Sequence, residues 1–171
     1  MPDKEAPPSS KKWHVAKWPP LAWLETGLKL VASVIGVVAL VQALVASSFR
    51  WPAGLRLVQF GVLVLLSLGL VAAIWDRYLE REVVAMVFIL LNNLGHWGMV
   101  VSLASRPGPG WLLLAFVLLM LAGDAIKLVF LQWQDFSVRD TPRVMLFGLT
   151  SSYIVGYLVV LLSELMLFFR S

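Results

Sequence analysis

Five apolar stretches, each about as long as a lipid bilayer is thick, constrain this sequence more than any other feature. A transmembrane α-helix needs about 20 mostly apolar residues at about 1.5 Å of rise per residue. The five stretches cover residues 24–47, 53–75, 83–104, 111–131 and 144–169. They are apolar on every side, which disfavours surface helices, and they lack the alternation typical of membrane β-strands. The sequence therefore predicts an all-α, polytopic integral membrane protein with a five-helix transmembrane bundle.

The composition supports a chain whose outer surface meets the lipid bilayer. Of the 171 residues, 60% are hydrophobic and only 14% are charged, whereas soluble domains carry about 25% charged residues. The absence of cysteine excludes disulfides and thiolate metal sites. The net charge of +4 comes from residues in the expected loops. We therefore expect no nucleic-acid partner, no cofactor and no metal site.

The polar ends of the apolar stretches predict how the chain is oriented. Residues 1–20 form a polar, Pro-rich segment, and residues 21–171 then form a single transmembrane domain. Short cytoplasmic loops carry an excess of Lys and Arg. A cytoplasmic N-terminus places eight such residues inside and four outside: Lys4, Lys11, Lys12, Lys17, Arg77, Arg81, Arg139 and Arg143 against Arg50, Arg56, Arg106 and Arg170. The sequence thus predicts a multi-pass protein of a cell inner or plasma membrane, with a cytoplasmic N-terminus and an outside C-terminus.

Short connections join the five stretches. Because short connections favour antiparallel packing of successive helices, we expect consecutive helices to be neighbours. Residues 76–82 contain neither Gly nor Pro, so the second helix is expected to continue beyond the lipid before the chain turns.

Asp124 is the first candidate for a functional residue. It lies well inside the fourth stretch, where a charge costs about 2.5–3.5 kcal/mol on insertion scales. Lys127 lies three residues further on, on the same helix face. The two residues predict either a proton or cation relay, or an internal ion pair that fixes helix packing.

A polar patch in the third stretch is the second candidate. Asn92, Asn93 and His96 share a helix face at three- and four-residue spacing. Gly95 and Gly98 would allow another helix to approach closely. The patch predicts either hydrogen bonds between helices or a ligand or proton site shared with Asp124.

Charged residues near the ends of the fifth and first stretches allow two further predictions. Glu164, near the outer end of the fifth stretch, is expected to reach the interface, or to pair with His96 if their helices touch. Glu25 and Lys29 are four residues apart and predict an interfacial ion pair.

The sequence contains no recognisable catalytic motif. H-E-x-x-H, G-x-S-x-G, the P-loop and the dinucleotide fingerprint are all missing. We therefore expect a non-enzymatic accessory or assembly protein, whose partner would be another membrane protein or a second copy of the chain. One alternative is a carrier or channel for a small solute, ion or proton, which would use the polar groups named above. A second alternative is an intramembrane enzyme acting on a lipid-like substrate, with His96 and an acid.

Overall fold

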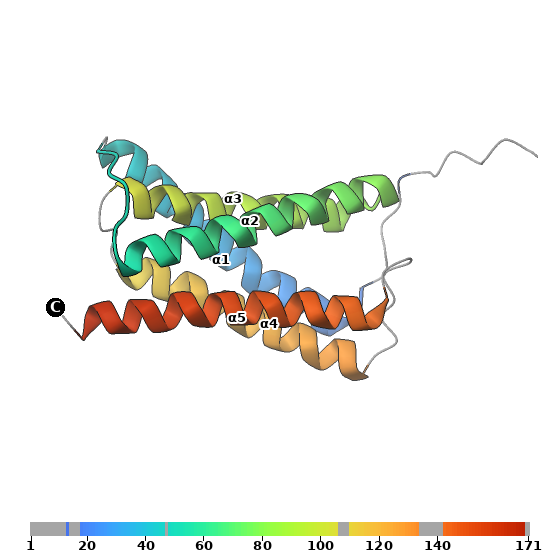
Figure 1. The fold of residues 1–171 in the computed structure, drawn as a ribbon. Coiled ribbons are helices and arrows are strands. Elements are labelled where there is room, and N and C mark those ends of the chain that lie inside the picture. Colours follow the sequence, from blue (N-terminus) through green and yellow to red (C-terminus); the bar gives the residue numbers. More distant parts are fainter. Residues whose placement is uncertain (1–12, 14–17, 47, 106–109, 134–141, 170–171) are drawn as a thin grey trace, which may run out of the picture.

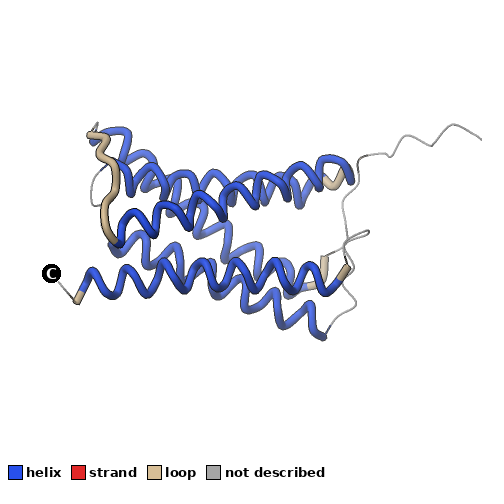
Figure 2. Tube along the Cα trace, in the orientation of Figure 1, coloured by secondary structure: helices blue, strands red, loops and turns tan. Residues whose placement is uncertain are grey.

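The protein is a bundle of five long helices. The computed structural model describes residues 13, 18–46, 48–105, 110–133 and 142–169 (Figure 1). These residues contain α1 (Pro20–Ala46), α2 (Leu55–Glu80), α3 (Val83–Ser105), α4 (Gly110–Trp133) and α5 (Arg143–Phe168), joined by loops (Figure 2). All five are long and apolar enough to cross a membrane. The predicted all-α, multi-pass membrane bundle is therefore confirmed, whereas most of the N-terminal segment lies outside the described residues.

Local backbone chemistry explains where α2 and α3 meet. The second helix continues to Glu80, as the lack of Gly and Pro predicts. Arg81 then adopts a left-handed conformation with φ 58°, and the N–H of Glu82 donates to the carbonyl of Arg77. A left-handed residue with such a backbone bond is a common helix ending. The turn is therefore tight, and α3 begins at Val83.

The helices pack as a ring in the order α1, α3, α2, α5, α4, and back to α1. Each helix packs mainly on the two beside it in this order, and Figure 1 shows α1 running obliquely to α2, α3 and α5. The expectation that consecutive helices are neighbours is correct for α2 with α3 and for α4 with α5. It is wrong for α1 with α2 and for α3 with α4, which are not among the main packed pairs. Between α1 and α2, the eight residues 47–54 can span about 26 Å when extended, which is enough to pass across a third helix.

Glycines bring α1 and α3 into close contact. A Cβ atom added to Gly36 would meet the backbone of Gly95, and one added to Gly98 would meet the backbone of Gly36. A Cβ on Gly95 would lie 2.6 Å from the Cα of Ser33. Small residues are typical of such contacts in membranes, where van der Waals packing drives helix association.

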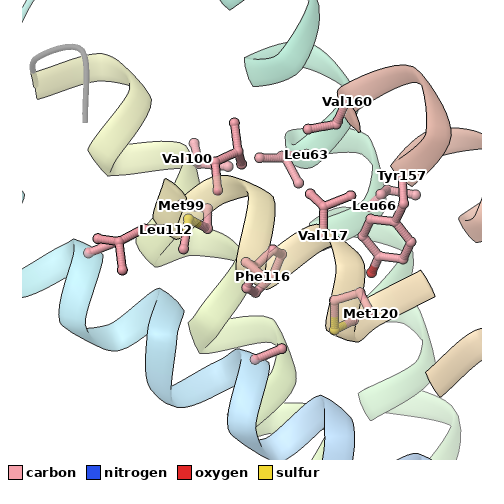
Figure 3. Close-up of a cluster of buried hydrophobic side chains, with 13 residues drawn as sticks. Leu63, Leu66, Met99, Val100, Leu112, Phe116, Val117, Met120, Tyr157 and Val160 are labelled. Carbon is pink, nitrogen blue, oxygen red and sulfur yellow. The ribbon is translucent and has the colours of Figure 1, made fainter. Parts of the chain in front are cut away.

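Apolar side chains from all five helices fill the centre of the ring. The cluster includes Leu63 of α2, Phe116 and Val117 of α4, and Tyr157 and Val160 of α5, all with no exposed surface (Figure 3). Where these side chains meet, the centre of the bundle is a packed apolar core.

The contact between α1 and α3 predicts a specific loss of stability. Gly36→Ala would force a methyl group against the Gly95 backbone, and such overpacking costs about 1–3 kcal/mol. Gly27→Ala is the matched control in the same helix, because a Cβ there meets nothing within 4 Å. We expect the free energy of unfolding, measured by denaturing-detergent titration, to fall for the first variant and not for the second. Equal stability of the two variants would contradict the contact.

Candidate functional site

Polar residues of four helices lie at one depth in the bundle. The end where α1, α3 and α5 begin is called the Pro20 end here, and the opposite end the Phe168 end. Lys29, Asn92 and Asp124 each lie nine residues from the terminus of their helix at the Pro20 end, and Tyr153 lies ten residues from it. This distance corresponds to about 13 Å at helical rise. Asp124 and Asn92 therefore lie at the same depth, as a site shared between them would require.

Lys29 is held between two carboxylates. Its Nζ atom lies 2.6 Å from Oε1 of Glu25 and 2.6 Å from Oδ1 of Asp124. The Asp124 side chain is only 4% exposed, and that of Lys29 is 14% exposed. Because a buried charge without a partner is strongly destabilising, this bridge between α1 and α4 accounts for how the membrane interior tolerates Asp124. We call Glu25, Lys29 and Asp124 the inner triad.

The predicted partner of Asp124 is corrected by this geometry. Lys127 was expected to pair with Asp124, yet no ion pair joins Lys127 to a carboxylate among the described residues. Lys29, on a different helix, takes that place because Gly123 lets it lie against α4. A Cβ on Gly123 would come within 3.1 Å of Cγ of Lys29. The expected interfacial pair of Glu25 and Lys29 is formed, but it is buried and extended to a third residue.

Three buried oxygen atoms close to this depth have no hydrogen-bond partner among the described residues. They are Oδ2 of Asp124 and the Oδ1 atoms of Asn92 and Asn93. A buried polar atom without a partner costs about 1–3 kcal/mol, and such exceptions call for an explanation. The second oxygen of Asp124 is therefore available to a proton or to another donor.

His96 joins α3 to α5 through Tyr157. The Nδ1 atom of the imidazole lies 2.8 Å from the carbonyl oxygen of Asn92, and its Nε2 atom lies 2.6 Å from the hydroxyl oxygen of Tyr157. A carbonyl oxygen can only accept, so Nδ1 carries a hydrogen. In the neutral ring, Nε2 is then the acceptor and the Tyr157 hydroxyl donates to it. His96 is fully buried, and its ring packs edge-on against Phe116 of α4.

The His96–Tyr157 pair lies about one helical turn beyond the inner triad. His96 and Tyr157 are 13 and 14 residues from the Pro20-end termini of their helices. Figure 3 shows the Tyr157 hydroxyl directed toward Met120, which precedes Asp124 by one turn of α4. Ionisable and hydroxyl groups thus continue from the inner triad towards the middle of the bundle.

Glu164 belongs to a separate cluster near the Phe168 end. Its carboxylate accepts from Nη1 of Arg56 at 2.5 Å, from Nη2 of Arg56 at 3.3 Å and from Nε2 of Gln59 at 2.8 Å. The expected solvated carboxylate is therefore wrong, because Glu164 is only 5% exposed. Glu164 does not pair with His96, because α3 and α5, whose contact that pairing required, are not among the main packed pairs. We call Arg56, Gln59 and Glu164 the outer cluster.

Sequence reasoning missed three residues that complete these networks. Gln59 and Tyr157 are fully buried polar side chains, and Arg56 was counted only as a loop charge. A glutamine one turn inside an otherwise apolar helix is a signal that could have indicated the outer cluster. Tyr157 lies in the middle of α5, away from the interfaces where tyrosine is enriched, so its position in the sequence was a signal as well.

The described residues contain no group of three or more His, Cys, Asp or Glu side chains that could hold a metal ion. No protein-family model, no curated protein and no solved structure matches the chain. The five apolar helices define the class as a multi-pass helical membrane protein.

The inner triad predicts unequal roles for the two lysines. Lys29→Met leaves two buried carboxylates without their cation, and breaking a buried pair in this way costs about 3–5 kcal/mol. Lys127→Met is the control, because Lys127 forms no ion pair within the described residues. We expect a large fall in the free energy of unfolding for the first variant and a small one for the second. Adding Glu25→Gln and Asp124→Asn to Lys29→Met should restore much of the loss, whereas equal effects of the two lysines would refute the triad.

Proposed function

We propose that this protein is a membrane carrier or channel for protons, with Asp124 as the residue that binds and releases the proton. The observation that carries the proposal is the second oxygen of Asp124, which is buried near the middle of a membrane-spanning helix and has no hydrogen-bond partner among the described residues. Ionisable residues inside membrane spans are costly, and they mark ion pathways and proton relays by default.

The neighbouring groups support proton transfer from Asp124 further into the bundle. Tyr157 can give its hydroxyl proton to Nε2 of His96 while its oxygen receives another proton from the side of Asp124. In this step the O–H bond of protonated Asp124 and that of Tyr157 break, a new O–H bond forms at Tyr157 and an N–H bond forms at Nε2 of His96. One proton thus leaves Asp124, and the imidazole gains one. The 2.6 Å distance between Tyr157 and His96 is suited to such a transfer.

The packing of the core favours a proton over a larger solute. Phe116 and Met120 lie beside the His96–Tyr157 pair and are almost completely buried. A solute would have to displace these side chains, whereas a proton needs only a chain of hydrogen-bonding groups. For this reason we propose that the transported species is a proton rather than a small solute or a larger ion.

Asp124→Asn tests the proposal. This variant keeps the size of the side chain and leaves Lys29 paired with Glu25, so the bundle should fold. We expect proton flux into proteoliposomes, followed with an internal pH-sensitive dye under an imposed gradient, to fall to the level of protein-free liposomes. Asp76→Asn removes the same charge from an exposed position of α2 and should leave the flux unchanged.

A second candidate is a non-enzymatic accessory or assembly protein. It is supported by two ion pairs within the chain, Lys29 with Asp124 and Arg56 with Glu164. Each pair joins two helices and so stabilises the packing of the bundle. If the parent protein carries no flux, this second candidate is favoured over the carrier. A stable complex with another membrane protein, or with a second copy of the chain, should then survive purification in a mild detergent.

The enzyme alternative receives less support. Both ring nitrogens of His96 are engaged, and among the described residues no hydrogen bond joins this ring to a serine or an acid.

We further propose that the Pro20 end faces the cytoplasm of a cell inner or plasma membrane. The excess of Lys and Arg on that side of the sequence supports this orientation. Because the chain has no cysteine, single cysteines at Ser10 and Ser171 can report it. We expect a membrane-impermeant thiol reagent to label Ser171→Cys in intact cells, and to label Ser10→Cys only after permeabilisation. The reverse pattern, or labelling of both in intact cells, would rule the orientation out.

A further inference from the structure

The outer cluster closes the bundle near the Phe168 end. Glu164 of α5 binds Arg56 and Gln59 of α2, and Nε2 of Gln59 also lies 3.5 Å from the carbonyl oxygen of Val160. A Cβ atom added to Gly110 would clash with Oε1 of Glu164, so the carboxylate lies against the first turn of α4. Three helices therefore converge on one buried carboxylate.

An apolar layer separates the outer cluster from the His96–Tyr157 pair. Along α2, Leu63 follows Gln59 by one turn, and along α5, Val160 precedes Glu164 by one turn. Both side chains are fully buried and pack in the same core cluster as Val117 (Figure 3). This layer contains no side-chain donor or acceptor that could continue a hydrogen-bonded chain.

The Pro20 end is different, because ionisable groups there begin near the helix termini and continue inward. Glu25 and Lys127 lie five and six residues from the termini of α1 and α4, and Lys29 and Asp124 follow within one turn. The two ends of the bundle are therefore unequal in their polar content.

We infer that the outer cluster is a lock that keeps water from the Phe168 end out of the interior, so that in this structure Asp124 exchanges protons only with the Pro20 end. The inference rests on the proposed proton function for its role in transport, but the lock itself can be tested without any flux. Opening of the Arg56–Glu164 contact would be the step that connects the His96–Tyr157 pair to the Phe168 end.

The lock is tested first by water access. Val160→Cys places the only cysteine of the chain directly beneath the outer cluster. With the lock intact, a membrane-impermeant thiol reagent should not react with it. The double variant Arg56→Gln with Glu164→Gln removes both charges together, so that no buried charge is left unpaired, and in this background we expect the cysteine to react. Leu162→Cys, which is exposed on the outer face of α5 and meets lipid there, should stay unreactive in both backgrounds if the bundle remains folded.

The role of the lock in transport is tested by proton flux. We expect the double variant to raise the flux about tenfold, which corresponds to a barrier lowered by about 1.4 kcal/mol. Arg50→Gln is the control, because it removes an exposed arginine near the same end without touching the cluster. Asp124→Asn should abolish the increased flux of the double variant.

The outcomes separate the lock from the proton function. Labelling of Val160→Cys with the lock intact, or no labelling after its removal, overturns the lock. Labelling that appears on removal, together with flux that rises and depends on Asp124, supports both ideas. Labelling that appears while no variant carries flux supports the lock and overturns the proton function.

Discussion

The bridge from Lys29 to two carboxylates is the interaction on which the interior of this bundle depends. A single ion in a low-dielectric interior loses several kcal/mol of hydration, and here three ions occupy one small region of the core. The bridge joins α1 to α4, which are adjacent in the ring but separated by two helices in the sequence. Any rearrangement of these two helices must therefore keep Lys29 within reach of Glu25 and Asp124, or neutralise them.

The two halves of the bundle use their polar groups differently. Towards the Pro20 end, charged residues, a histidine and a tyrosine follow one another at intervals of about one turn. One carboxylate oxygen there has no hydrogen-bond partner within the part of the chain that the structure describes. Towards the Phe168 end, one bidentate arginine–carboxylate contact and a glutamine lie above an apolar layer. Bidentate contacts are among the stronger hydrogen-bonded ion pairs. The fold thus combines a half in which buried polar groups follow one another with a half in which a single polar cluster lies above an apolar layer.

The sequence predicted which residues are unusual better than it predicted their partners. Asp124, His96 and Glu164 were all recognised because a polar group in an apolar stretch is conspicuous. Their partners were not, since Lys29, Tyr157 and Arg56 each come from a different helix. Lys127 was the expected partner of Asp124 because spacing along one helix is visible in the sequence. Contacts between helices depend on which helices are neighbours, and the order of the ring does not follow the order of the chain.

The sequence by itself determined the number of membrane-length helices and their approximate bounds. These properties follow from hydropathy and helical rise, which are local and additive along the chain. Only the tertiary structure decided the ring order, the close contact of Gly36 with Gly95, and the choice of Lys29 as the cation for Asp124. These properties depend on the shapes of facing helix surfaces, because small residues let some helices approach closely and a connection of eight residues lets one helix pass another.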